Sequence, residues 1–96
     1  LSGTPGQRAA LAEALLGGVN LIDCSRNYVD GVAETVVGET LADLVSTGKL
    51  AREAVILCTK AGYIQGQLYA SLQDDPPTEV VRFADGLWHC LHPDFL

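Results

Sequence analysis

The fold is decided by residues 19–28, VNLIDCSRNY, and by the later run of residues 55–60, VILCTK. Each stretch is a short apolar segment that leads to a charged residue, Asp23 in the first and Lys60 in the second. One amphipathic helical pattern lies between them, so the order predicts a βαβ unit whose right-handed crossover makes the two strands parallel and adjacent. Asp23 and Lys60 then lie at the same carboxyl edge of a sheet whose neighbouring strands are about 4.8 Å apart.

A helical pattern precedes each of the two strands. The first, residues 4–18, opens with Thr-Pro, a cap followed by proline at the first helical position, and closes with Gly-Gly. The second, residues 30–48, places Val37, Leu41 and Leu44 at i, i+4 and i+7, the spacing of a helix face turned toward a sheet. The order helix–strand–helix–strand therefore predicts an α/β fold.

Periodicity fades from residue 61 onward. Residues 61–94 contain scattered glycines, a pair of aspartates and a pair of prolines, and they are predicted to form one long loop excursion with room for short strands. A connection of that length in a compact domain is commonly functional. We expect it to serve as a lid or as a wall of a substrate pocket.

The composition of the chain argues against several classes of protein and partner. The hydrophobic share is 48%, but it is spread over short runs, so no membrane-spanning segment is expected. The net charge is −6 and there is no basic stripe, which argues against nucleic acid as a partner. Three cysteines without C-x2-C spacing indicate neither a disulfide framework nor a metal site. A cytoplasmic protein with reduced thiols is expected, and its oligomeric state is not readable.

Tyr28 joins the charged pair, because it follows Asp23 by five residues and starts from the same edge of the sheet. An acid, an amine and a phenol at the carboxyl end of parallel strands indicate a catalytic site, since α/β sheets and barrels hold their sites there. Each of the three residues alone has an ordinary structural interpretation as a loop or strand-end residue. Catalysis becomes the favoured interpretation when the three are taken together with the sequence pattern that flanks them.

The pattern around these residues resembles the early part of an aldo-keto reductase. The resemblance covers most of residues 5–62 and rests on residues 18–28, on Gly31, Glu34 and Gly38, and on Arg52 leading into residues 55–60. It implies a (β/α)8 TIM barrel in which NADPH reduces the carbonyl of a small aldehyde or ketone. It also implies a catalytic tetrad of Asp, Tyr, Lys and His.

By this resemblance, the catalytic residues are Asp23, Tyr28 and Lys60, with Asp23 also cofactor-binding and Tyr28 also substrate-binding. Tyr28 would be the general acid for the carbonyl oxygen. A free phenol, with a pKa of about 10, is a weak acid at neutral pH. A cationic Lys60 beside it strengthens the acid, and Asp23 keeps that lysine charged and oriented. No Gly-x-Gly-x-x-Gly fingerprint follows either strand, so NADPH is inferred from the resemblance alone.

The tetrad histidine is expected beyond residue 96. Residues 87–96, LWHCLHPDFL, resemble a segment that precedes the strand with that histidine in one branch of the family, so neither His89 nor His92 is assigned to the tetrad. A barrel needs roughly 250 residues. We therefore expect residues 1–96 to be a fragment of a single barrel domain, truncated at both ends, that is inactive and without cooperative melting by itself.

Several residues near the three catalytic candidates also need an interpretation. Glu34 is interpreted as structural, fixing the loop that carries Tyr28, and Gly38 as allowing close approach of helix and strand. Cys24 stands where the family commonly has a small hydroxyl residue, a conservative departure in size. Arg26 and Asn27 lie beside the site, but a solvated surface position is as good an interpretation for each. Tyr63, Gln65 and Trp88 could line the substrate pocket, although a core position is favoured for Trp88. A metal site made of His89, Cys90 and His92 is disfavoured.

A second function stays open beside the enzyme. The same barrel can be kept as a non-enzymatic binding or regulatory subunit, as in some relatives of the family. The presence of Asp23, Tyr28 and Lys60 together favours the enzyme. A histidine at the end of the strand that follows would support catalysis, and its replacement would support the binding role.

Overall fold

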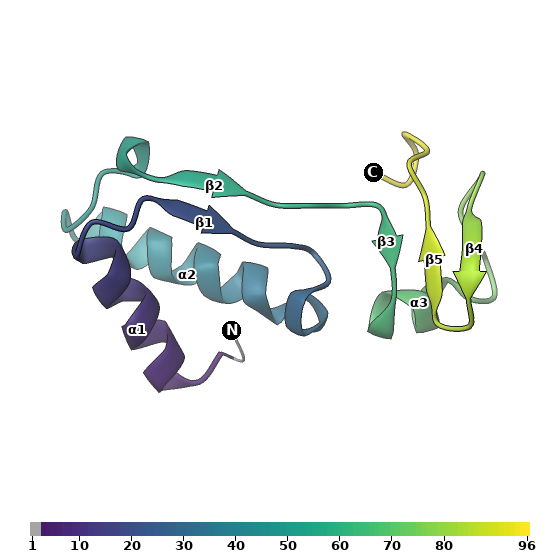
Figure 1. Cartoon of the computed structure of the whole chain (residues 1–96), viewed down its shortest axis with the longest axis horizontal. Coiled ribbons are helices and arrows are strands. Elements are labelled where there is room, and N and C mark those ends of the chain that lie inside the picture. Colours follow the sequence, from purple (N-terminus) through teal and green to yellow (C-terminus); the bar gives the residue numbers. More distant parts are fainter. Residues whose placement is uncertain (1–2) are drawn as a thin grey trace. The chain divides into compact units, whose positions relative to one another are not determined.

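The computed structural model describes residues 3–96, and the chain divides into two compact units, Leu1–Thr59 and Lys60–Leu96. The first unit follows the predicted order helix–strand–helix–strand, with two short 3-10 turns added (Figure 1). Its elements are α1 (Pro5–Leu16), β1 (Leu21–Asp23), η1 (Tyr28–Gly31), α2 (Val32–Ser46), η2 (Arg52–Ala54) and β2 (Ile56–Cys58).

The first helix begins where the sequence predicts. Thr4 is the N-cap of α1, and its hydroxyl accepts a hydrogen bond of 3.3 Å from the backbone N–H of Gln7. Pro5 takes the first helical position, where its missing N–H costs no hydrogen bond. The chain leaves the helix through Gly17 and through Gly18 at φ 109°, a conformation that glycine adopts without strain.

The two strands of the first unit are parallel neighbours, as the βαβ pattern predicts. Leu21 lies opposite Ile56, and Asp23 lies opposite Cys58. The pairing continues past the end of β1, because the backbone N–H of Cys24 donates a 2.8 Å hydrogen bond to the carbonyl of Cys58. The α/β class is therefore confirmed. The described residues form a two-stranded parallel sheet here and no closed barrel.

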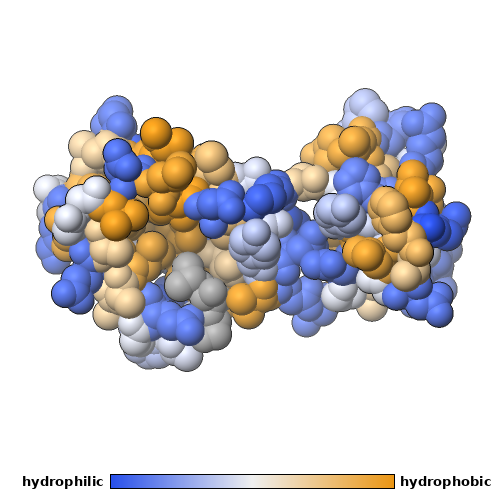
Figure 2. Space-filling model, viewed as in Figure 1, coloured by the Kyte–Doolittle hydropathy of each residue, from blue (hydrophilic) through white to orange (hydrophobic). Residues whose placement is uncertain are grey.

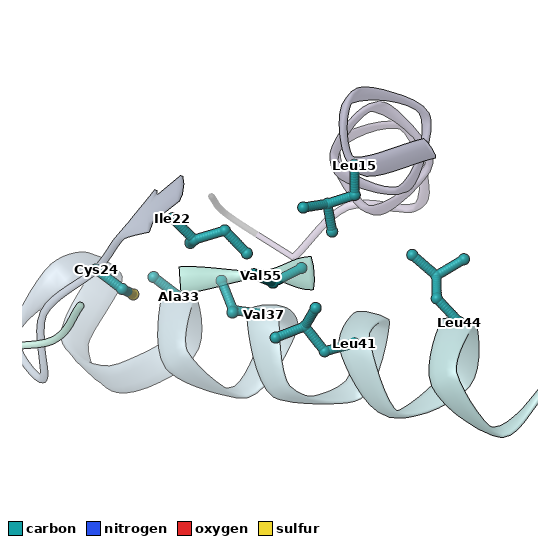
Figure 3. Packing of buried hydrophobic residues seen from close by; sticks show 8 residues of the cluster. All are labelled: Leu15, Ile22, Cys24, Ala33, Val37, Leu41, Leu44 and Val55. Atoms are coloured by element: carbon teal, nitrogen blue, oxygen red, sulfur yellow. The ribbon is translucent and has the colours of Figure 1, made fainter. Parts of the chain in front are cut away.

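One face of this sheet packs on α2. The helix presents Val37, Leu41 and Leu44 at the predicted spacing, and all three are buried. Figure 3 shows all three pointing from α2 to the side on which Ile22, Val55 and Leu15 lie. The complete cluster consists of Leu15, Ile22, Cys24, Ala33, Val37, Leu41, Leu44 and Val55. Burial of this apolar surface is the main force that holds α1, α2 and the strands together.

The opposite face of the sheet is apolar and open. Leu21 is 55% exposed and Ile56 is 59% exposed, and Figure 2 shows hydrophobic surface over β1 and β2. Parallel sheets are normally covered on both faces. This open face is the side of the first unit that further structure would cover.

The second unit holds short strands and a helix within the predicted excursion of residues 61–94. They are β3 (Tyr63–Ile64), α3 (Gly66–Leu72), β4 (Val81–Ala84) and β5 (Leu87–His89), and the antiparallel sheet has the order β3-β5-β4. Ile64, Trp88 and Cys90 are its buried core. The favoured interpretation of Trp88 as a core residue is confirmed.

Within residues 3–96, no helix combines the length and the apolar character that crossing a membrane requires.

Gly38 does not serve the close helix–strand approach that the sequence suggests, and that interpretation was wrong. A Cβ built at Gly38 meets no heavy atom within 4 Å, because the residue borders open space on α2. Gly62 is the opposite case. Its φ is 118°, and a Cβ there would lie 2.8 Å from His89 Nε2.

We predict that Gly38→Ala stabilises α2 by about 1 kcal/mol, because alanine has the higher helix propensity and meets no clash. Gly62→Ala should instead destabilise the second unit by about 1–3 kcal/mol through overpacking. Backbone-amide hydrogen exchange of α2 and of β5 measures the two effects separately. A loss of protection in α2 on Gly38→Ala would contradict the first expectation.

Candidate active site

Asp23 lies at the carboxyl end of β1, on the open face of the sheet. Burial alternates along the strand, with Leu21 exposed, Ile22 buried against α2 and Asp23 exposed. Successive side chains of a strand point to opposite faces, so Asp23 shares the face of Leu21, away from the helix. The sequence prediction of a carboxylate at the carboxyl edge of a parallel sheet is confirmed.

A tight turn leads from Asp23 to Tyr28. Ser25 is buried, its carbonyl accepts a 3.2 Å hydrogen bond from the N–H of Tyr28, and its hydroxyl accepts one of 3.4 Å from the N–H of Asn27. Cys24 is buried in the core beside α2. Tyr28 itself is 46% exposed and starts the 3-10 turn η1.

The turn after Tyr28 is strained. Val29 has φ 50° and ψ 41°, and Asp30 has φ 54° and ψ 40°, both in the left-handed region. For a β-branched residue such as valine this conformation is a genuine outlier. Gly31 follows at φ 93° and caps α2, and a Cβ there would come within 3.0 Å of the Arg26 guanidinium. The backbone thus reverses direction within three residues and brings the chain from Tyr28 directly into α2.

Lys60 follows the end of β2 and is the first residue of the second unit. Cys58, the partner of Asp23 in the register, is the last residue of β2, and Thr59 and Lys60 come next. Lys60 is exposed. The structure therefore confirms that the strands leading to Asp23 and Lys60 are parallel and in register, and the link between the carboxylate and the ammonium stays a prediction.

Glu34 has a hydrogen-bond partner just beyond the end of β2. It was interpreted as structural, and its carboxylate Oε1 accepts a 2.5 Å hydrogen bond from the hydroxyl of Thr59. A role in fixing the loop that carries Tyr28 stays a prediction. Thr59 was not singled out in the sequence. The sequence feature that could have pointed to Thr59 is its position directly before Lys60.

A small cavity of about 110 Å³ lies between α2 and the end of β2. Glu34 and Thr59 are the polar part of its wall. The complete lining is Cys24, Glu34, Val37, Gly38, Leu57 and Thr59. Apart from Glu34, this lining offers the Thr59 hydroxyl no strong side-chain acceptor.

The other candidates of the first unit, Arg26 and Asn27, are half-buried. In the second unit, Tyr63 is 50% exposed and its ring lies 4.7 Å from that of His89 in an edge-on arrangement. Gln65 is exposed next to α3.

The residues considered for a metal site have other contacts. The Cys90 thiol is buried and donates to the carbonyl of Thr78 at 3.3 Å. His92 Nδ1 accepts a hydrogen bond of 3.2 Å from the N–H of Asp94. Over residues 3–96, no three His, Cys, Asp or Glu side chains gather as a metal ion would require.

Comparison with known proteins gives one result. The sequence model of the Aldo/keto reductase family matches residues 5–85 of this chain. No curated protein and no solved structure gives a significant match. The matched range contains Asp23, Tyr28 and Lys60 and ends before residues 87–96, so the resemblance of that last segment to one branch of the family stays a prediction.

We predict that Val29→Asn stabilises the first unit by about 1 kcal/mol, because asparagine adopts the left-handed conformation more readily than valine. Val32→Asn is the matched control, since Val32 is also exposed but has φ −65°. Hydrogen exchange of the α2 amides should show greater protection for the first variant only. Equal effects of the two substitutions would mean that strain at Val29 is not the cause.

Proposed function

Because this chain belongs to the aldo-keto reductase family, we propose that it is part of an NADPH-dependent oxidoreductase that reduces aldehyde or ketone carbonyls. Oxidoreductase chemistry with a nicotinamide cofactor is typical of the family. The observation that carries the proposal is the parallel register of β1 and β2, with Asp23 opposite Cys58. That register brings the strand ends of two candidate catalytic residues to one edge.

The strands of the first unit are proposed to belong to a (β/α)8 barrel. A barrel places helices outside and strands inside, and α2 covers one face of the β1–β2 sheet only. The apolar side chains of Leu21 and Ile56 on the other face would then fill the barrel interior. In this proposal residues 1–96 are a fragment of one domain, and residues 61–94 form a long excursion within it.

The family match supports the proposed pairing of Lys60 with Asp23, because the matched range of residues 5–85 contains both. Asp23 is exposed at the carboxyl end of β1, and Lys60 follows the parallel neighbour β2 by two residues.

The residues have complementary roles in carbonyl reduction. When bound, the reduced nicotinamide would supply the hydride that forms the new C–H bond at the carbonyl carbon. Tyr28 would donate its phenolic proton to the carbonyl oxygen, which gives the alcohol and leaves a phenolate. The ammonium of Lys60 would stabilise that phenolate, and Asp23 would keep the lysine charged and oriented.

Asp23 is also the proposed contact of this chain with the cofactor. It is exposed at the carboxyl end of β1, the edge where α/β proteins bind nucleotides. A carboxylate there can accept hydrogen bonds from hydroxyl and amide groups, which both occur on a nicotinamide nucleoside. The residues present thus fit the nicotinamide end of the cofactor.

A non-enzymatic binding or regulatory barrel is the alternative. The fourth tetrad residue separates the two, because a histidine at the carboxyl end of the following strand supports catalysis and its replacement supports the binding role. For the 96 residues alone we propose no activity, because three tetrad members without the histidine form an incomplete site. The proposed substrate is a small carbonyl compound, and the proposed location is the cytoplasm.

We predict that Tyr28→Phe, in the complete protein that carries this chain, lowers kcat for carbonyl reduction by roughly 10²–10⁴-fold, because the proton donor is lost. NADPH binding, measured by fluorescence titration, should be unchanged. Lys60→Met should lower kcat as well, and the double variant should be little worse than Tyr28→Phe, because the two residues act as a unit.

Tyr69→Phe is the control for that experiment. Tyr69 is half-buried in the second unit, where its hydroxyl accepts a hydrogen bond from Gln73, and the proposal gives it no role in the chemistry. It should keep normal turnover. Near-normal turnover of Tyr28→Phe would remove Tyr28 from the role of general acid.

A further inference from the structure

The backbone of Tyr28 is held on both sides by hydrogen bonds. Its N–H donates a 3.2 Å bond to the carbonyl of Ser25, a buried residue that follows the end of β1 by two positions. Its carbonyl accepts a bond from the N–H of Val32, the first residue of α2. The proposed proton donor is therefore tied to the end of β1 on one side and to the start of α2 on the other.

The chain between Tyr28 and Val32 is a left-handed turn. Its three residues are Val29 at φ 50°, Asp30 at φ 54° and Gly31 at φ 93°. Right-handed values at the same positions would wind the chain in the opposite sense. The direction in which α2 leaves Tyr28 therefore depends on the hand of this turn.

Both ends of the left-handed turn are fixed within the first unit. The strand β1 is fixed by its parallel pairing with β2. The helix α2 is fixed on the sheet by Val37, Leu41 and Leu44, which are all buried. A change of hand is therefore absorbed by the turn and by Tyr28, whose ring would change direction relative to the end of β1.

Val29 adopts its conformation at a cost in free energy, because a β-branched residue is a genuine outlier in the left-handed region. Its side chain is 47% exposed, and over residues 3–96 it belongs to neither buried cluster. Core packing of this side chain thus does not offset the strain. Strain of this kind persists where the surrounding structure imposes it, and it is concentrated at active sites.

We propose that Val29, Asp30 and Gly31 are positioning residues, whose left-handed turn sets the direction of the Tyr28 phenol for proton donation. The inference rests on the proposed function, because it takes Tyr28 as the general acid. The strain at Val29 reduces the free-energy advantage of the left-handed form over a relaxed one. A second strained residue in the turn would then release Tyr28 in a fraction of the molecules.

Gly31→Ala, in the complete protein, adds that second strained residue, because alanine adopts φ 93° far less readily than glycine. The atom nearest to the added Cβ is the movable end of the Arg26 side chain, at 3.0 Å. We expect kcat to fall roughly 10-fold, the effect of a displaced catalytic group. The dissociation constant for NADPH should change less than about twofold, and the Tyr28 amide should exchange faster. Gly31→Asn imposes a milder strain and carries the same test if Gly31→Ala does not fold.

A second substitution tests whether strain is the cause. Val29→Asn relieves strain in the same turn, so the double variant Val29→Asn with Gly31→Ala should recover most of the lost turnover. Val32→Asn is the first control, since Val32 is also exposed but has φ −65°, and it should restore nothing. Gly38→Ala is the second control, because it is expected to stabilise α2 outside the turn. It should keep normal turnover alone and restore none to Gly31→Ala.

The isotope effect separates positioning from a folding defect. A smaller folded fraction lowers the apparent kcat but leaves unchanged the effect of deuterating NADPH at its transferable hydrogen, whereas a misdirected Tyr28 slows the chemical step and raises it. An unchanged isotope effect in Gly31→Ala, equal recovery by Gly38→Ala and Val29→Asn, or normal kcat in Gly31→Ala would each overturn the inference alone. Full activity of Tyr28→Phe would overturn the catalytic scheme and the inference with it.

Discussion

The parallel pairing of β1 with β2 is the constraint on which the first unit depends. A register with Asp23 opposite Cys58 requires a crossover, and α2 supplies it by packing Val37, Leu41 and Leu44 on one face of the two strands. A slip of one residue would turn Ile22 out of the core and Asp23 into it. The hydrophobic pattern therefore specifies the register, and the register places the carboxylate at the edge where chemistry is possible.

Much of this unit could be predicted from the sequence because its signals are local. The cap at Thr4 acts within one turn of helix, and the 3.6-residue spacing of the α2 core residues appears within a dozen positions. The parallel pairing of the strands follows from chain topology, since two strands joined by one helix have few other arrangements. For the same reason the positions of Asp23 and of the end of β2 could be predicted before any coordinates.

The parts that could not be predicted depend on contacts between distant residues. The strands β3, β4 and β5 are two to four residues long, too short for an alternating pattern to show, and β3 pairs with residues about 25 positions away. The hydrogen bond of Glu34 to Thr59 could not be predicted for the same reason, since a side-chain contact of this kind produces no periodic pattern in the sequence. Gly38 was misjudged because a glycine that permits close contact and one that borders open space look alike in sequence.

The two faces of the β1–β2 sheet differ in their side chains: one face packs on α2, and the other carries the candidate catalytic residue Asp23. Ile22, Cys24 and Leu57 lie on the side of α2 and supply packing, whereas Asp23 lies on the open side. Because side chains alternate, any residue held on one side fixes its neighbour on the other. The strained turn at Val29 and Asp30 connects Tyr28, which follows β1, directly to α2. On this view α2 supports both the register of the two strands, through its core residues, and the turn that begins at Tyr28, which leads directly into it.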